Sequence, residues 1–294
     1  MELSAEIRSI NSDYKNFIEK IRYKYNHTLS SHAFASLHLW QHAMRLSLLC
    51  GEDFFTVKCE AAKPNMWFFP CGNQQEAYDF ISENISDSSF SMCYLRESDK
   101  NWLEEKFPDK WDFYRTDGSD EYICNVSEYT SLRGSKFSEI RRKIRKINRE
   151  CNITIREISE ETLSDAIYVV NNWNTAEHSI GENGVTDSNV AEFALNERKS
   201  LDINGIIVYS DCVPISVFAG FPLSDDTVDV LIGKCTSDAP KGTAYYALRE
   251  YLHSLNGKYI FCNHEEDLGI EGIRQMKSSL FPCKKNEMWE AVLK

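Results

Sequence analysis

The stretch VDVLIGKCTSDAPKGTAYYALREYLHSL, residues 228–255, decides how the C-terminal half of this chain folds. Its first eight residues predict a strand, and apolar side chains then recur at helical spacing from Ala244 to Leu255. Gly242 stands at the mouth of this helix, where a glycine lets backbone N–H groups approach an anion. Lys241 would strengthen such a site for phosphate. An ordinary structural turn is the alternative, because Pro-x-Gly turns commonly precede helices.

Helices and strands alternate outward from this stretch along the whole chain. We expect further strands at residues 54–59, 66–69, 90–95, 121–126, 153–158, 205–209, 214–221, 259–263 and 287–293. Further helices are expected at residues 34–49, 74–85, 99–107, 136–150, 161–173, 187–199 and 269–280. This order predicts an α/β (α+β) protein with mixed, mainly antiparallel sheets flanked by helices. No long linker separates the halves, and we place the boundary after residue 150, which gives domains 1–150 and 151–294.

Composition limits the class of protein. A chain of 294 residues is long enough for one large or two ordinary domains with a real core. The net charge of −12 excludes a surface coated uniformly for nucleic acid or anionic lipid. No apolar run approaches the roughly 18 residues of a membrane span, and the N-terminus lacks the apolar core of a signal peptide. We therefore expect a cytoplasmic protein without a membrane span.

Cysteine and histidine spacing gives no metal site. The ten cysteines contain no C-x-x-C pair, so neither a zinc knuckle nor a thioredoxin-like pair is indicated, and reduced core thiols are expected. His38 and His42 are four apart in an expected helix, but no third ligand stands near them. We expect a structural role for both histidines.

The helix expected at residues 136–150 has two distinct faces. Apolar residues form one stripe, and eight lysines and arginines lie between residues 133 and 149. Such a face concentrates positive potential for an anionic ligand, whether a phosphate, a nucleotide or the acceptor end of a tRNA. A solvated face paired with acidic residues is the alternative. General single-strand binding is not favoured, because no aromatic residues are interleaved for stacking. The cations on this face are Arg141, Arg142, Arg145, Lys146 and Arg149.

An acidic loop follows the strand expected at residues 259–263. The candidate catalytic residues are Glu265, Glu266 and Asp267. Glu265 or Glu266 is a candidate general base for an attacking amine or hydroxyl, and Asp267 is also expected to cap the next helix. Arg274 and Lys277 are three apart on that helix, so they share a face and are candidates to hold one anion. The alternative is a capped surface helix whose cations pair with the acids.

The order of elements around Gly242 resembles the core of the GNAT acyltransferases. In that fold, splayed central strands and the loop-to-helix turn hold an acyl donor. Residues 263–282 resemble, in addition, the signature Asn-x-Glu-x-Asp-Leu-Gly-Ile-x-Gly-Leu-Arg-x-x-Lys of the family built around the C-terminal domain of phosphatidylglycerol lysyltransferase. Residues 31–40, 66–72 and 132–148 resemble other segments of that family. The resemblance covers nearly the whole chain and implies two tandem GNAT-like domains.

The family resemblance also implies a function. It implies transfer of an aminoacyl group from aminoacyl-tRNA to an amine or hydroxyl of a small-molecule or peptide acceptor, with no permanently bound cofactor. Acyl-CoA is the alternative donor, although one glycine stands where acetyltransferases usually have two or more. A non-catalytic ligand-binding module is the third possibility. The matched positions are Asn263, Glu265, Asp267, Gly269, Gly272, Arg274 and Lys277, with Arg141, Arg142, Arg145 and Asn148 on the basic helix.

In this reading, Lys241, Gly242 and Thr243 bind the donor phosphate. The sequence departs from the family at Phe281-Pro282, where a Tyr-Pro is usual, and in the basic helix, where Arg-Lys-Ile replaces a frequent Arg-Asn-His. The membrane-spanning flippase half of the lipid-modifying enzymes is absent, so the resemblance does not imply a phospholipid acceptor.

Overall fold

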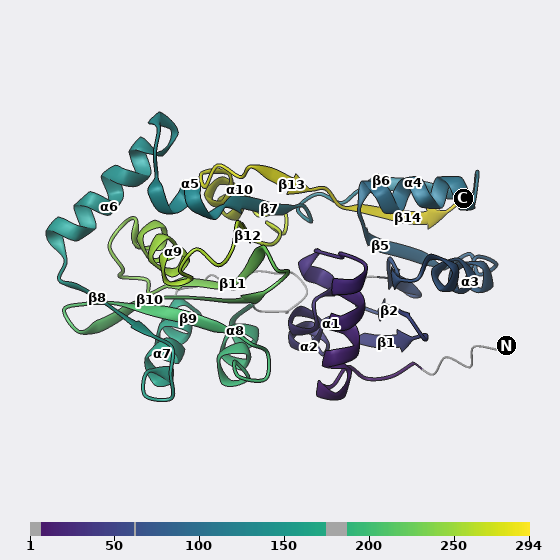
Figure 1. Ribbon diagram of the computed structural model, residues 1–294, viewed down its shortest axis with the longest axis horizontal. Helices are drawn as coiled ribbons and strands as arrows, with labels where there is room; N and C mark the ends of the chain where they lie inside the picture. Colours follow the sequence, from purple (N-terminus) through teal and green to yellow (C-terminus); the bar gives the residue numbers. More distant parts are fainter. Residues whose placement is uncertain (1–6, 62, 175–186) are drawn as a thin grey trace. The chain divides into compact units, whose positions relative to one another are not determined.

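The chain forms two compact units in the computed structural model, which describes residues 7–61, 63–174 and 187–294 (Figure 1). Unit 1 comprises Met1–Glu121, Glu266–Gln275 and Lys285–Lys294, and unit 2 comprises Tyr122–Glu265 and Met276–Lys284. The units divide at residue 121 and not at residue 150. The physical reason is that helix α6 (Ser138–Glu150) packs against α9 (Thr243–Ser254) inside unit 2.

Unit 1 is built on a mixed seven-stranded sheet. Its strand order is β1-β2-β3-β5-β14-β6, with the short β4 also paired to β2, and only β3 and β5 run parallel. The strands are β1 (Leu46–Cys50), β2 (Phe54–Cys59), β3 (Met66–Phe68), β4 (Cys71–Gly72), β5 (Ser91–Leu95), β6 (Trp111–Arg115) and β14 (Trp289–Leu293). The helices are α1 (Lys15–Lys24), α2 (Phe34–Trp40), α3 (Gln74–Asn84) and α4 (Glu97–Lys106), with 3-10 turns at Ser12–Tyr14 and Ser30–His32.

Local sequence explains where these helices begin and what they bury. Asn73 caps α3 by accepting hydrogen bonds from the backbone N–H groups of Gln75 and Glu76. Asp99 in the first turn of α4 accepts from the backbone of Arg96. An aromatic cluster that includes Phe54, Phe80, Phe90, Trp67 and Trp111 fills the core of the unit.

The helix expected at residues 34–49 is wrong beyond Trp40. Arg45 adopts a left-handed backbone conformation with φ 50°, which ends the helical path, and Leu46–Cys50 pairs with β2 as strand β1. His42 therefore lies outside the helix, so the expected i, i+4 histidine pair does not form on one helical face. Among the described residues, no group of three metal-ligating side chains is present.

Unit 2 is built on a second mixed sheet of seven strands, in the order β13-β7-β12-β11-β10-β9-β8. The strands are β7 (Glu121–Asn125), β8 (Ile153–Glu157), β9 (Asn204–Ser210), β10 (Val213–Pro222), β11 (Thr227–Cys235), β12 (Phe261–Asn263) and β13 (Lys284–Asn286). The helices are α5 (Val126–Ser131), α6, α7 (Leu163–Asn174), α8 (Asp187–Asn196) and α9, with a 3-10 turn at Ser135–Phe137. Helix α10 (Glu271–Ser278) belongs partly to each unit, because the division falls between Gln275 and Met276.

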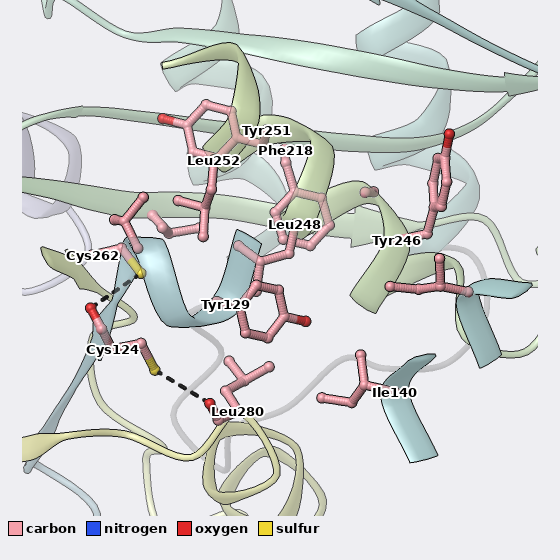
Figure 2. Close-up of a cluster of buried hydrophobic side chains, with 14 of the residues drawn as sticks. Cys124, Tyr129, Ile140, Phe218, Tyr246, Leu248, Tyr251, Leu252, Cys262 and Leu280 are labelled. Carbon is pink, nitrogen blue, oxygen red and sulfur yellow. Dashed lines mark hydrogen bonds between the residues drawn. The ribbon is translucent and has the colours of Figure 1, made fainter. Parts of the chain in front are cut away.

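The amphipathic patterns of α6 and α9 are confirmed by their packing. Ile140, Ile144 and Ile147 of α6 are buried in one cluster with Leu248 and Tyr251 of α9. Figure 2 labels Ile140, Leu248 and Tyr251 of this cluster. This cluster continues onto β7, β11 and β12 of the sheet. The two mixed sheets with their flanking helices confirm the expected fold class.

None of the helices in the described ranges combines the length and the apolar composition needed to cross a bilayer. Residues 1–6, which belong to the N-terminal stretch inspected for a signal peptide, lie outside those ranges.

A buried histidine pair in unit 1 predicts acid sensitivity. The rings of His27 and His32 are 4.2 Å apart, and both side chains are buried. Burial lowers the pKa of His27 well below 6.5 and that of His32 to about 3, and the charges of Arg96 and Arg22 act in the same direction. Below pH 6.5 the unfolded chain binds more protons at these two histidines than the folded chain does. The fold therefore keeps its full stability above pH 6.5 and loses stability as the pH falls towards 3.

We expect the free energy of unfolding of unit 1 to fall by about 1.4 kcal/mol per pH unit for each histidine below pH 6.5. His27→Phe should remove one histidine's share of that slope. It should leave stability at pH 7.5 unchanged, because the ring nitrogens of His27 accept and donate no hydrogen bond among the described residues. Urea titrations at pH 7.5, 6 and 5 measure both effects. A wild-type slope in the variant would contradict this account.

Candidate functional site

The central strands of unit 2 form a fork. Parallel strands β11 and β12 pair only through Thr227 with Phe261, Val228 with Cys262 and Asp229 with Asn263. Beyond Asp229, β11 continues to Cys235, and no strand in the described ranges pairs with that edge. The backbone N–H and C=O groups on that edge of β11 therefore have no strand partner in the described ranges.

A β-bulge lies at the same point. The register between β10 and β11 shifts between Ala219 and Phe221, so that Val230 and Leu231 together face the single residue Gly220. A bulge disrupts the ladder locally and turns backbone groups out of register. The bulge and the end of β12 therefore coincide at the fork.

The helix that follows β11 begins at Gly242. Gly242 has φ 103°, and a Cβ added there would lie 2.8 Å from the Cβ of Lys143, so α6 crosses the start of α9 closely. Lys241 is exposed beside it, and the ammonium of Lys143 lies 4.6 Å from the ring centroid of Tyr245. Thr243 is buried, and its hydroxyl donates to the carbonyl of Pro240 at 2.7 Å. Lys241 and Gly242 thus lie where the sequence placed them, while the hydroxyl of Thr243 holds the turn.

The cations of α6 divide into two kinds. Arg141 donates to the carbonyls of Leu132 and Gly134 at 2.5 and 2.6 Å, which secures the left-handed end of α5. Arg142 forms two hydrogen bonds with Glu139, at 2.9 and 2.7 Å. Arg145 is exposed and makes no ion pair with any described residue. Of the three expected anion-binding arginines, Arg145 is the one whose charge is not already engaged.

The acidic loop starts at the end of β12. Asn263 is fully buried and accepts a hydrogen bond from the backbone N–H of Glu265 at 2.8 Å, while its own side-chain N–H group has no partner among the described residues. Glu265 adopts a left-handed backbone with φ 54° and is half-buried. Its carbonyl accepts from Tyr122 at 3.3 Å. Unit 2 therefore holds Glu265 two residues beyond the fork.

Asp267 and Arg274 form an ion pair within unit 1 whose carboxylate is buried. The Asp267 carboxylate is 3% exposed and accepts from Arg274 at 3.0 and 3.1 Å and from the backbone N–H of Gly269 at 2.9 Å. Arg274 also donates to Asp117 at 2.7 Å, and these hydrogen bonds raise the pKa of the guanidinium. The expectation that Asp267 caps the helix is wrong, because α10 begins at Glu271 and Asp267 closes the turn before it.

This ion pair changes the interpretation of the two cations on α10. Two carboxylates already compensate Arg274, so an anionic ligand would have to displace one of them. Lys277 is only 8% exposed. A shared grip of these two side chains on one anion remains a prediction, and the contacts of Arg274 favour the structural alternative.

Sequence patterns did not indicate Tyr94, whose phenol feels the charge of Glu266 in the acidic loop. Cys93 and Tyr94 of β5 together face Glu290 of β14, and Tyr94 has φ 55°, which rotates it out of the normal strand alternation. In unit 1 the charge of Glu266, together with burial, raises the pKa of the Tyr94 phenol well above its usual value. No periodicity signals such a bulge, since it depends on pairing with a strand from the far end of the chain.

These arrangements define a class of protein, a GNAT-like acyltransferase fold repeated in tandem. A tandem GNAT protein from the clavulanic acid biosynthesis pathway superposes with a TM-score of 0.50 at 5% identity, over 98% of both chains. The chain belongs to the family of phosphatidylglycerol lysyltransferase C-terminal domains, whose model matches residues 22–289. Both the resemblance and the tandem fold expected from the sequence are confirmed.

Two other solved structures show how widely the fold is shared. A conserved protein of unknown function from Bacteroides thetaiotaomicron has a TM-score of 0.88 at 22% identity, over 99% of this chain and 100% of its own. L-PGS from Bacillus licheniformis has a TM-score of 0.69 at 12% identity, over 97% and 92%. Curated proteins gave no sequence match.

Replacing Arg274 tests whether its role is structural. We expect Arg274→Met to lower the thermal midpoint of unit 1 by several degrees, because the buried Asp267 carboxylate loses its charge partner. Asp117→Asn, which changes the second carboxylate that Arg274 contacts, is the matched control. The side chain of Asp117 is 84% exposed, so this change should leave the midpoint nearly unaltered. Wild-type stability in Arg274→Met would show that the arginine is kept for a ligand.

Proposed function

We propose that this chain is an aminoacyltransferase that moves an aminoacyl group from aminoacyl-tRNA to an amine or hydroxyl of a small-molecule or peptide acceptor. The observation that carries the proposal is the close packing of the basic helix α6 over the glycine start of α9, beside the open fork of β11 and β12 in unit 2. Each of these features belongs to unit 2, so the proposal needs no assumption about how the units are arranged.

The charge of this region supports a polyanionic donor. The whole chain carries a net charge of −12, yet Lys143, Arg145 and Lys241 have no carboxylate partner among the described residues. Two of them flank the N-terminus of α9, whose backbone N–H groups and dipole also attract phosphate. The acceptor end of a tRNA brings several phosphates in sequence, and separate cations on α6 and at the start of α9 suit such a chain better than a single pyrophosphate.

The chemistry proposed at the fork is ester aminolysis or transesterification. The acceptor's nitrogen or oxygen attacks the ester carbonyl, Glu265 takes the proton that the acceptor loses, and the C–O bond to the ribose breaks. The proton then passes to the ribose oxygen that leaves. Backbone N–H groups on the open edge of β11 are suitably placed to stabilise negative charge on the carbonyl oxygen. Positioning supplies the rest of the acceleration, and no covalent enzyme intermediate is required.

The family supports an aminoacyl group in particular. Its description names a lysyltransferase, and lysyl is an aminoacyl group. An acyl-CoA-dependent N-acetyltransferase is the second candidate, favoured by the tandem GNAT fold itself. A non-catalytic module that binds the same ligands is the third. Incubation with tRNA charged with radiolabelled lysine or with acetyl-CoA, each beside a mixture of amine acceptors, separates the three. Transfer from acetyl-CoA alone would reverse the order, and binding without transfer would favour the third.

Removing the proposed base should slow transfer. We expect Glu265→Gln to lower turnover about 10²- to 10⁴-fold, the usual contribution of a general base. Glu271→Gln is the matched control, since Glu271 is an exposed carboxylate of α10 that accepts from Gln275 at 2.7 Å. Glu266→Gln tests the neighbouring carboxylate. Full turnover in both Glu265→Gln and Glu266→Gln would show that neither carboxylate is the base.

Charge reversal on α6 tests the tRNA surface separately from catalysis. Arg145→Glu should weaken tRNA binding and lower the slope of log K against log salt by about 1, the loss expected for one phosphate contact. Arg142→Glu is the matched control, because the 74% exposed Arg142 already pairs with Glu139 on the same helix. Fluorescence anisotropy across a salt series measures both. Equal losses in the two variants would indicate a diffuse charge effect without a defined contact.

A further inference from the structure

Two cysteines face each other across neighbouring strands of unit 2. Cys124 of β7 and Cys262 of β12 are direct partners in an antiparallel register. Hydrogen bonds from Val126 to Ile260 and from His264 to Tyr122, both 2.9 Å, lie two residues to either side. The cysteines therefore occupy a hydrogen-bonded position, where Cα atoms are about 5.5 Å apart. That separation lies within the range that a disulfide spans, roughly 4.4–6.8 Å.

The side chains of this pair are both buried in unit 2, and each thiol contacts a backbone carbonyl. Both cysteines are reduced, and they are 1% and 0% exposed. The Cys262 thiol donates to the carbonyl of Cys124 at 3.6 Å, and the Cys124 thiol contacts the carbonyl of Leu280 at 3.9 Å (Figure 2). The Nε2 atom of His264 lies 3.4 Å from the sulfur of Cys262. Two thiols and one imidazole thus form a contiguous buried group.

The two thiols of this group differ in acidity, which suits them to different steps of a thiol oxidation. The neighbouring Cys262 thiol, with the imidazole of His264, lowers the pKa of the Cys124 thiol. The same coupling and complete burial raise the pKa of Cys262. Because the thiolate is the nucleophile, Cys124 is the attacking sulfur and Cys262 remains a protonated thiol beside it.

No other cysteine pair in the described ranges is arranged in this way. Cys59 and Cys93 are both buried in unit 1, but they belong to β2 and β5, which strand β3 separates. Cys283 is exposed and donates to the backbone carbonyl of Ile123 at 3.2 Å. Cys212 is exposed in the turn between β9 and β10. Facing thiols with an adjacent imidazole are therefore particular to Cys124 and Cys262.

We propose that Cys124 and Cys262 are a peroxide-oxidised dithiol that closes to a disulfide between β7 and β12. The Cys124 thiolate attacks hydrogen peroxide, the O–O bond breaks, and after uptake of one proton the products are a Cys124 sulfenic acid and water. The Cys262 sulfur then attacks the sulfenic sulfur, forms the S–S bond and releases a second water, while His264 relays the thiol proton. Two thiols lose two electrons, and one peroxide is reduced to two waters.

Access to the pair comes through the short segment that covers it. Leu280 belongs to the few residues between α10 and the three-residue edge strand β13, and its carbonyl contacts the Cys124 thiol. Short edge elements open locally at lower cost than a sheet interior, which admits a molecule as small as peroxide. The disulfide would fix β12 one residue before Asn263, whose side chain holds the backbone of Glu265.

The experiment needs no activity and uses the full chain. Reduced protein is freed of reductant, treated with hydrogen peroxide, blocked with an alkylating agent and mapped by mass spectrometry without reduction. We expect titratable thiols to fall from ten to eight and one linked peptide pair to join Cys124 to Cys262. Cys212→Ser, an exposed control, should form the same link. Cys262→Ser should instead trap a sulfenic acid on Cys124 that dimedone labels.

Two results would overturn the proposal. One is oxidation confined to the exposed Cys212 and Cys283, with Cys124 and Cys262 recovered as free thiols. The other is a link from Cys124 to Cys283. His264→Gln should form the disulfide more slowly than the wild type. Mapping of the wild type decides the matter even if a variant fails to fold.

Discussion

A parallel pairing only three residues long between β11 and β12 organises unit 2. The pairing ends at Asp229 and Asn263, and β11 then runs on alone to Cys235. An antiparallel continuation would have sealed that edge with a regular ladder. The bulge in β11 and the loop after Asn263 both begin where β12 stops. The turn at Gly242 follows the end of β11. Where the strands separate, the edge of β11 has no strand partner among the described residues, and the proposed transfer depends on this edge.

The family motif after β12 is mainly a device for shaping the acidic loop. Asn263 fixes the backbone of Glu265, and Asp267 with Arg274 locks the turn before α10. Close approach contributes as well, since a Cβ on Gly118 would lie 2.0 Å from the backbone nitrogen of Gly269. A motif that reads as a row of catalytic groups therefore contains several residues that hold the backbone in place. Glu265 and Glu266 are the carboxylates of the loop that the proposed function uses.

Sequence periodicity located most elements but not their partners. The apolar stripe of α6 and the strand–glycine–helix order at residues 228–255 are local properties, so the chain displays them directly. Strand β14 lies between β5 and β6, and β7 lies between β13 and β12, which no local pattern encodes. The candidate site shows the same limit. Lys241 and Gly242 were found from spacing, whereas the contact of Arg274 with Asp117, 157 positions away, and the bulge at Tyr94 depend on long-range pairing.

The basic helix shows why counting charges overstates an anion site. Arg141 donates to the carbonyls at the end of α5, and Arg142 pairs with a carboxylate one helical turn away. Their contacts keep α6 and the preceding loop in shape, and this places Lys143 over the start of α9. Apart from Arg141, Lys143 and Arg145 are then the cations of α6 without a carboxylate partner among the described residues. In a chain of net charge −12, a local excess of positive charge attracts polyanions, so the proposed preference for a polyanionic donor depends on two or three cations and not on the whole basic helix.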